Sequence, residues 1–289
     1  MKLPNFFWIG PQKSASTWAY FCFKEHPDIY VHKKEKLSDI GGDSLHYFDM
    51  YYHKGEEWYQ QFFEDYSNEK AIGDTTSSYI RSQKAAQRIA KEAPKAKIIT
   101  CLRNPVDRAY SHYWHEKSKG KINFEFSEVF ENYDLFQNWI EPGFYYSNLQ
   151  NYFDNFDREN ILIMFLEDLK QDDHKFIKEV YKFLEVDHSF KPSVLTDKVN
   201  TASNERDWKH DLIKQSIGSL EKMGLKKYFT QSSNPVINSL KNIKNKLINK
   251  KEYKEGIGPE VRSRLKELYK EETKKLEQIV KKDLSHWYN

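Results

Sequence analysis

The sequence predicts an α/β protein in which helices cover both faces of a parallel sheet. Short apolar runs alternate with stretches of helical periodicity along the 289 residues, an order typical of parallel sheets. The first run, Phe6–Ile9, leads through Gly10 into a small-residue turn and then an apolar helical stretch. Strand, phosphate-binding loop and helix follow one another in this order in nucleotide-binding proteins.

Each predicted strand is a short apolar run, and we expect strands at residues 6–9, 71–73, 97–102 and 161–165. Helices are expected at residues 17–25, 82–93, from 105 onward, 146–156, 176–184 and 259–281. Pro27 ends the first helix, Ser82 caps the second, and Pro105 occupies a first turn, where its missing N–H is not needed.

We expect one domain over residues 1–289. Residues 226–255 are rich in lysine and asparagine and contain Pro235, which predicts a basic, partly flexible insertion. A basic surface for an acidic acceptor is the alternative interpretation of this segment. Residues 256–289 return to helical periodicity, and Trp287 is expected to pack this end back on the core.

Composition excludes several classes of function. The net charge is only +3, which does not indicate a general nucleic-acid binder, and 31% of residues are charged. No apolar stretch reaches the length of a membrane span. Cys22 and Cys101 fall in a predicted helix and strand, so we expect buried thiols in a reducing compartment and a cytoplasmic protein.

The turn after the first strand, "GPQKSAST", places its lysine ahead of the loop. In the familiar phosphate loop, G-x-x-x-x-G-K-[ST], the lysine follows the second glycine. The backbone amides of residues 14–17 can still form an anion nest at a helix N-terminus, and the Ser16 and Thr17 hydroxyls can donate to the same anion. The alternative is an ordinary strand-to-helix turn capped by Ser14 or Ser16.

A second candidate anion site follows the strand at 97–102, in "LRNPVDRAYSHYW". Arg103 ends the strand, while Arg108 and Ser111 share a face of the following helix. Phosphoryl-transfer enzymes usually carry an acidic residue for magnesium at a later strand end, whereas arginine and serine bind an anion without metal. A solvated helix face is the alternative for Arg108 and Ser111. Two anion sites predict a ligand phosphorylated at both ends.

Together, "GPQKSASTW" and "LRNPVDRAYSHYW" resemble the two nucleotide-binding motifs of sulfotransferases that use 3′-phosphoadenosine-5′-phosphosulfate (PAPS). "HPDIY", "GDTTSSY", "PGFYYSNLQNYF" and "DLSHW" extend the similarity over most of the chain, closest in style to heparan sulfate N-sulfotransferase domains and their single-domain bacterial relatives. The resemblance implies a P-loop-NTPase-like fold that uses PAPS and needs no metal.

The resemblance also implies roles for individual residues. Lys13 would stabilise the leaving group and so be catalytic, while the 5′-phosphosulfate would be surrounded by Gln12, Lys13, Ser14, Ala15, Ser16, Thr17 and Trp18. Arg103 and Ser111 would hold the 3′-phosphate. Ala15 replaces the family glycine, which the loop tolerates only if this residue avoids positive φ.

Two further departures concern later motifs. Thr75 stands in place of a lysine of the heparan-type enzymes, and the late glycine-arginine phosphate loop is missing. Asn200, Ser203 and Arg206 are the candidates to replace that loop, with a capped polar turn as the alternative.

The general base is expected in a split family motif. Glu35 is the first candidate and His46 the second, with Asp43 a further possibility. The alternatives are a solvated charge run around Glu35 and a half-buried packing role for His46. His112 and His115 are spaced like metal ligands, but no cysteine or acidic partner accompanies them, so we expect no metal site.

We therefore expect a sulfotransferase that moves a sulfuryl group from PAPS to a hydroxyl or amine, with a carbohydrate as the favoured acceptor. The expected partners are the nucleotide donor and this acceptor, and not nucleic acid. A P-loop nucleotide or small-molecule kinase is the alternative enzyme, and a nucleotide-binding relative without turnover is the non-enzymatic alternative.

Overall fold

The computed structural model describes residues 3–32, 44–195 and 256–289 of a chain that divides into two compact units. The main unit comprises residues 1–113, 124–196 and 259–289, and the second comprises 114–123 and 197–258. Because most of the second unit lies outside the described residues, the architecture given below is that of the main unit. The single domain with an insertion at 226–255 stays a prediction.

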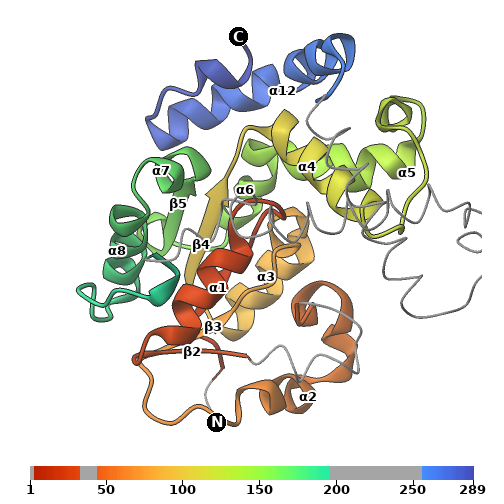
Figure 1. Ribbon diagram of the computed structural model, residues 1–289. Coiled ribbons are helices and arrows are strands. Elements are labelled where there is room, and N and C mark those ends of the chain that lie inside the picture. The colour runs from red at the N-terminus through yellow and green to blue at the C-terminus, as the bar shows by residue number, and fades with distance from the viewer. Residues whose placement is uncertain (1–2, 33–43, 196–255) are drawn as a thin grey trace, which may run out of the picture. The chain divides into compact units, whose positions relative to one another are not determined.

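A parallel sheet of five strands in the order β2-β3-β1-β4-β5 forms the centre of the main unit (Figure 1). The strands are β1 (Phe6–Trp8), β2 (Ile29–Val31), β3 (Ala71–Asp74), β4 (Lys97–Leu102) and β5 (Ile161–Phe165). This sheet confirms the predicted α/β fold. The sequence analysis missed β2, because a three-residue edge strand is too short to show a periodicity.

Both faces of the sheet are buried, which explains why its strands are continuously apolar. Phe6 and Trp8 point into a core that contains residues of α1 (Ser16–Glu25) and α8 (Asp173–Leu184). Phe7 and Ile9 point into the opposite core, with α3 (Gln83–Glu92) and α6 (Tyr145–Phe153). The two helices α1 and α3 therefore pack against opposite faces of the sheet.

Helix boundaries follow the expected signals. The Ser82 hydroxyl accepts the Ala85 N–H at 3.1 Å, so the predicted cap of α3 is confirmed. Pro105 is the first residue of the next helix, as expected. The other α-helices of the described residues are α2 (Glu56–Gln60), α4 (Pro105–Lys117), α5 (Tyr133–Leu135), α7 (Leu166–Gln171) and α12 (Pro259–Val280).

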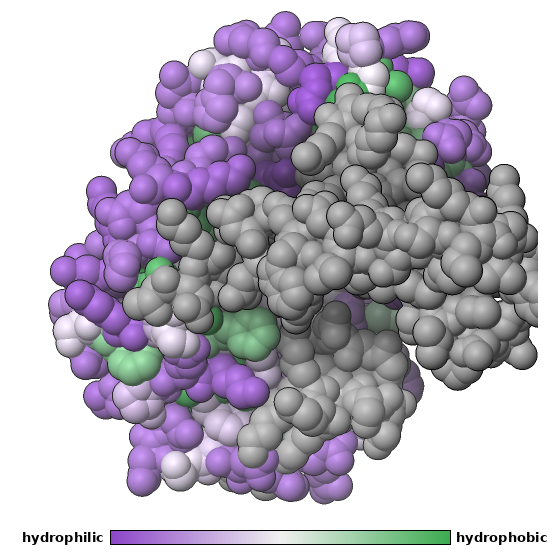
Figure 2. Space-filling view, in the orientation of Figure 1, coloured by the Kyte–Doolittle hydropathy of each residue, from purple (hydrophilic) through white to green (hydrophobic). Residues whose placement is uncertain are grey.

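The C-terminal helix α12 packs against α6, although more than 100 residues separate them in the sequence. The Ser147 hydroxyl donates to Glu272 at 2.7 Å, and the Tyr269 hydroxyl donates to the Ile140 carbonyl at 2.8 Å. Trp287 is buried in the core and donates from Nε1 to Glu167 at 3.2 Å. The surface that α12 and α8 present in Figure 2 is predominantly hydrophilic.

Cys22 and Cys101 are buried, reduced thiols in the core. Burial raises the pKa of both thiols, so they act as small apolar side chains, as expected. Across the three described ranges, no helix combines the length and apolarity needed to cross a membrane.

Candidate active site

The sheet has its topological switch point at β1. From β1 the chain passes beyond β3 to β2, whereas from β3 it crosses β1 to reach β4. Ligands of open parallel sheets bind at such a point, outside the carboxyl ends of the strands. Because Trp8 of β1 lies beside Ile99 of β4, the loops that follow these two strands leave the same edge.

The loop after β1 has the backbone of an anion nest. Lys13 and Ala15 adopt left-handed conformations with φ of 68° and 64°, and Ser14 between them does not. Alternation of this kind points successive N–H groups to one side, where an anion can bind. Ala15 therefore does take the positive φ that the sequence analysis required it to avoid, at a cost of roughly 1–2 kcal/mol.

Ser14 is the clearest sign that this loop accommodates a ligand. Its side chain is 0% exposed, and within the described part of the chain its hydroxyl has no hydrogen-bond partner. The N-cap of α1 is Ala15, and no side chain caps the helix. The alternative of an ordinary turn capped by Ser14 or Ser16 is therefore wrong. A buried hydroxyl without a partner is uncommon, and a phosphosulfate oxygen would satisfy it.

Arg103 joins the two motifs of the sequence. Its Nη1 donates to the Lys13 carbonyl at 3.3 Å, and its own carbonyl accepts the Tyr145 hydroxyl at 2.8 Å. The Thr100 hydroxyl donates to the Gly10 carbonyl at 2.6 Å, which ties β4 to the start of the loop. A guanidinium group thus lies beside the loop lysine, and both lie at the edge where the strands end.

Arg108 and Ser111 do not share a solvated helix face. Ser111 is half-buried in α4, whereas Arg108 is 0% exposed and donates from Nη2 to the Trp139 carbonyl. A spacing of three residues shows that two side chains lie on the same side of a helix, but it does not show whether that side faces solvent or the protein interior. Arg108 therefore braces α4 against the segment that carries Trp139.

The other loop residues differ in exposure. Gln12, Lys13, Ala15 and Ser16 are half-buried and Thr17 is exposed. Trp18 is 6% exposed and packs edge-on against Phe176 of α8 with ring centroids 5.7 Å apart, so its ring belongs to the core. The predicted residues from Gln12 to Thr17 thus form the loop and the first turn of α1, whereas the indole of Trp18 lies in the core.

A buried carboxyl group ends β3, next to β1. Asp74 accepts hydrogen bonds from the hydroxyls of Thr76 at 2.6 Å, Tyr59 at 2.8 Å and Tyr79 at 3.0 Å. Burial raises the pKa of Asp74 to about 6, against the lowering effect of these three hydrogen bonds. Sequence reasoning named Thr75 in this motif but missed the role of Asp74, although its place at a strand end was a visible signal.

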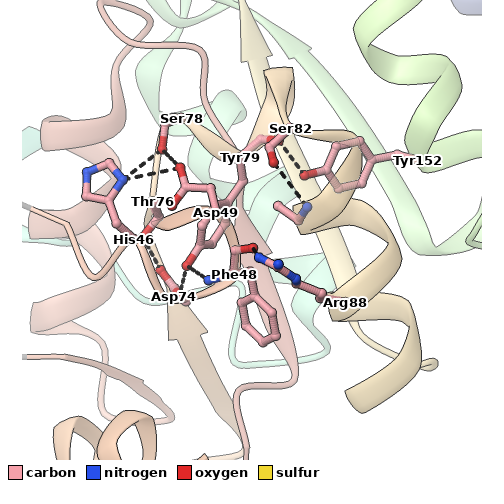
Figure 3. Close-up of polar contacts among 11 residues, drawn as sticks. His46, Phe48, Asp49, Asp74, Thr76, Ser78, Tyr79, Ser82, Arg88 and Tyr152 are labelled. Carbon is pink, nitrogen blue, oxygen red and sulfur yellow. Dashed lines mark hydrogen bonds and ion pairs between the residues drawn. The ribbon is translucent and has the colours of Figure 1, made fainter. Parts of the chain in front are cut away.

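His46 lies in a second polar cluster, shown in Figure 3. Its Nδ1 is 3.3 Å from Asp49 Oδ2 and 3.0 Å from the Ser78 hydroxyl, which donates to Asp49 Oδ2 at 2.5 Å. Burial would raise the pKa of Asp49, but hydrogen bonds with His46 and Ser78 hold it below its ordinary value. Asp49 and Ser78 were missed; the three-residue spacing of His46 and Asp49 was the available signal.

Five predicted residues lie outside the described ranges: Glu35, Asp43, Asn200, Ser203 and Arg206. His112 packs against the Trp139 ring with centroids 4.4 Å apart, as expected of a packing histidine. Within the described ranges, no group of three or more histidine, cysteine, aspartate or glutamate side chains could hold a metal ion.

Comparison with known proteins gives the family. A sulfotransferase-domain family model matches residues 3–277. The bifunctional heparan sulfate N-deacetylase/N-sulfotransferase 4 of Mus musculus is 33% identical over 202 residues, which cover 64% of this chain and 22% of the relative. Enzyme 3 of the same name from Homo sapiens is 33% identical over 199 residues, with the same coverage.

The chain thus spans about a fifth of the length of these curated relatives. A crystal structure of a sulfotransferase from Alicyclobacillus acidocaldarius aligns over 100% of both chains with a TM-score of 0.68 and 22% identity, which shows the same fold. With the family model matching nearly its whole length, the chain belongs to the sulfotransferase family.

Proposed function

We propose that this sulfotransferase binds PAPS at the carboxyl ends of β1 and β4 and transfers its sulfuryl group to a carbohydrate. The observation that carries the proposal is the buried Ser14 hydroxyl, which has no partner among the described residues and lies between two left-handed residues at the N-terminus of α1. A loop of this geometry offers N–H and O–H donors to an anion, and the positive end of the helix dipole favours the anion further.

The two ends of the nucleotide have separate sites in this proposal. The 5′-phosphosulfate lies against the loop, with hydrogen bonds from Ser14, Ser16 and Thr17. Arg103 and Ser111 hold the 3′-phosphate, the former through the guanidinium that already lies beside the Lys13 carbonyl. Asn200, Ser203 and Arg206 stay candidates for the same phosphate, outside the described residues.

Lys13 supports the transfer step itself. As the bond between sulfur and the bridging oxygen breaks, its electron pair remains on the 5′-phosphate, and negative charge grows at that oxygen. A lysine ahead of the nest supplies positive charge there, and charge stabilisation of this kind is usually the largest catalytic contribution. The acceptor proton must leave at the same time, and Glu35 and His46 are the candidates to take it.

The kinase alternative needs a carboxylate for magnesium near the loop. Asp74 ends the strand beside β1, where such a group belongs, but its carboxyl is 0% exposed and accepts three side-chain hydroxyls. Its oxygens are therefore committed to the protein. This commitment, together with the missing G-K-[ST] lysine, favours sulfuryl over phosphoryl transfer.

The choice of a carbohydrate acceptor rests on the relatives, which are named for heparan sulfate N-sulfation. An amine or hydroxyl of a sugar would approach the sulfate from the side away from the nucleotide. We therefore propose an amino or hydroxyl group on a carbohydrate as the acceptor, with the nucleotide as the second partner.

Isothermal titration calorimetry tests the nucleotide site. Adenosine 3′,5′-bisphosphate should bind far more tightly than AMP or ATP, and EDTA should leave its affinity unchanged. The variant Ser14→Ala should weaken this binding, whereas Ser189→Ala, which alters an exposed serine bonded to Asp187, should not. Preference for ATP, or binding that EDTA abolishes, would favour the kinase instead.

A transfer assay tests the reaction. Sulfate labelled in PAPS should pass to a heparosan oligosaccharide with free amino groups, or to its N-acetylated form if a hydroxyl is the acceptor. Transfer to a simple phenol but to neither sugar would contradict the proposed acceptor class and leave the donor site intact.

A further inference from the structure

We propose that His46 is the general base and that Asp49 and Ser78 position it by holding its Nδ1, so that Nε2 takes the acceptor proton. This inference rests on the sulfotransferase function proposed above and extends it to Asp49, in the same turn as His46, and to Ser78. The structure brings His46 and Asp49 of one turn against Ser78, which follows β3.

Proton counting assigns the tautomer. Burial would raise the pKa of Asp49, but hydrogen bonds with His46 and Ser78 hold it below its ordinary value, so the carboxylate is ionised at neutral pH and its oxygens only accept. The single proton of the Ser78 hydroxyl goes to Asp49 Oδ2, at 2.5 Å. Both groups that face His46 Nδ1 are then acceptors, and Nδ1 must carry a proton. The lone pair of the neutral ring is left on Nε2.

Nε2, the other ring nitrogen of His46, is the atom that would take the acceptor proton. In Figure 3 the dashed contacts of His46 reach one ring nitrogen, and the second lies on the opposite side of the ring. The His46 side chain is 28% exposed, while Asp49 beneath it is 13% exposed. A partly exposed histidine with one ring nitrogen held by hydrogen bonds has the arrangement that proton transfer at the other nitrogen requires.

The cluster lies beside the nucleotide loop. A Cβ added to Gly10 would lie only 1.9 Å from the Ser77 carbonyl oxygen, so the segment after β3 touches the start of the loop. The Ile80 N–H also donates to the Ile9 carbonyl at 2.9 Å. Ser78 lies between these two contacts. The segment that holds His46 is thereby joined to the loop that carries Lys13.

Buried hydrogen bonds hold the turn that carries His46. His46 itself has a left-handed backbone with φ of 52° and precedes a π-helical turn, Tyr47–Tyr51, a feature frequent at functional sites. The Phe48 N–H donates to the Tyr79 hydroxyl at 3.2 Å, and the Phe48 carbonyl accepts Arg88 Nη1 at 2.6 Å. Tyr79 in turn donates to Asp74, so the support reaches the buried carboxyl of β3.

One proton and one sulfuryl group move in the proposed step. The acceptor oxygen or nitrogen forms its bond to sulfur while its proton moves to Nε2 of His46. The bond from sulfur to the bridging oxygen breaks, with its electron pair left on the departing nucleotide. The imidazolium is stabilised by the Asp49 carboxylate through Nδ1–H and later returns its proton to water.

The tautomer can be read directly, without any acceptor. Long-range ¹H–¹⁵N correlation spectra of the full chain, labelled with ¹⁵N-histidine, distinguish Nδ1–H from Nε2–H. Because the chain has 10 histidines, the His46 signals are assigned by their loss in His46→Gln. We expect Nδ1–H at His46 in the neutral wild-type protein. A neutral Nε2–H tautomer would overturn the inference whatever the transfer assay shows.

The variant Asp49→Asn then separates positioning from folding. An amide can present N–H₂ to Nδ1 and so stabilise the other tautomer. We expect its transfer to the heparosan probe to fall on the order of 10²-fold, within the range of general-base effects, with bisphosphate affinity nearly unchanged. Ser78→Ala should lose less, because Asp49 still holds Nδ1. The matched control is Asp154→Asn, at an exposed aspartate whose carboxylate accepts a hydrogen bond from Gln150.

The comparison with Glu35 closes the test. If Glu35→Gln abolished transfer while His46→Gln and Asp49→Asn stayed within about threefold of wild type, the base would be Glu35 and the proposal wrong. If the wild-type protein did not bind adenosine 3′,5′-bisphosphate, that result would instead contradict the proposed nucleotide site. The two failures are therefore distinguishable.

Discussion

The loops that follow β1 and β3 leave neighbouring strands at the same edge but treat their polar groups in opposite ways. After β1, the buried Ser14 hydroxyl has no partner within the described residues, and two residues take left-handed conformations. After β3, Asp74 accepts three hydroxyls and Ser78 joins His46 and Asp49. The first loop has a buried donor that an anion could accept from, whereas the polar groups of the second loop bond to other side chains of the protein.

The largest expected effect is on the first loop. The variant Lys13→Ala should lower turnover by roughly 10²-fold or more, because it removes the charge that stabilises the leaving oxygen. Nucleotide affinity should change much less. Single-turnover transfer measures turnover, and calorimetry measures nucleotide affinity. The control is Lys24→Ala, at an exposed lysine in the last turn of α1. Unchanged turnover would mean that the front-placed lysine has no catalytic role.

The second loop predicts a pH effect on stability. The folded-state pKa of Asp74 is about 6, raised from an ordinary value of 3.8, so the folded protein binds its proton more tightly than the unfolded chain does. The stability from this group is therefore fully present below pH 3.8 and is lost as the pH rises through about 6. From the size of the shift, the loss is about 3 kcal/mol.

Urea unfolding at several pH values between about 4 and 7 measures this loss. The wild-type free energy of unfolding should fall more steeply with rising pH than that of Asp74→Asn, whose side chain does not titrate. The carboxyl groups common to both proteins cancel in this difference. Parallel curves for the two proteins would show that Asp74 is not the titrating group.

The next prediction concerns Arg103, which directly follows β4. The variant Arg103→Ala should weaken adenosine 3′,5′-bisphosphate binding by about 1.5–3 kcal/mol, the range for a hydrogen bond to a charged group. AMP, which lacks the 3′-phosphate, should lose much less affinity. Titration of both nucleotides gives the ratio, and an exposed arginine, Arg81, supplies the control Arg81→Ala. Equal losses for the two nucleotides would place Arg103 at the other end of the ligand.

The smallest effect concerns Ala15. Glycine at this left-handed position removes the steric cost but adds flexibility to the unfolded chain, so Ala15→Gly should raise the free energy of unfolding by less than about 1 kcal/mol. Ala19 lies inside α1, the helix that follows Ala15, so Ala19→Gly should instead destabilise the protein by about 1 kcal/mol or more. Thermal unfolding compares the two. A destabilising Ala15→Gly would contradict the strained loop.

Most strands and helices of the fold were predicted from local sequence patterns. The strands β4 and β5 were predicted at their observed residues, and the Ser82 cap and the Pro105 start were both confirmed, because each depends on neighbours in the sequence. The β2 edge strand was missed, since its three residues become a strand only by pairing with β3. The family could be recognised from two motifs, because both anion loops are contiguous.

Packing decided which side chains face the site. Arg108 and Trp18 lie in motifs that resemble the family's, yet both are buried. Helical periodicity gives the relative direction of two residues but not which side of the helix meets the core. Ala15 is a similar case, because the chemistry of alanine disfavours a left-handed backbone and only the surrounding loop imposes it.

The sequence by itself determined the α/β fold, the family and the two anion motifs, because these follow from hydrophobic spacing and from short contiguous stretches. The tertiary structure decided that Ser14 is buried with no partner in the part of the chain that is described, that Asp74 accepts hydrogen bonds from three hydroxyls, and that Ser78 contacts His46 and Asp49. The contacts of Ser78 with His46 and Asp49 join residues about 30 apart in the sequence, and they depend on distances that no local pattern encodes.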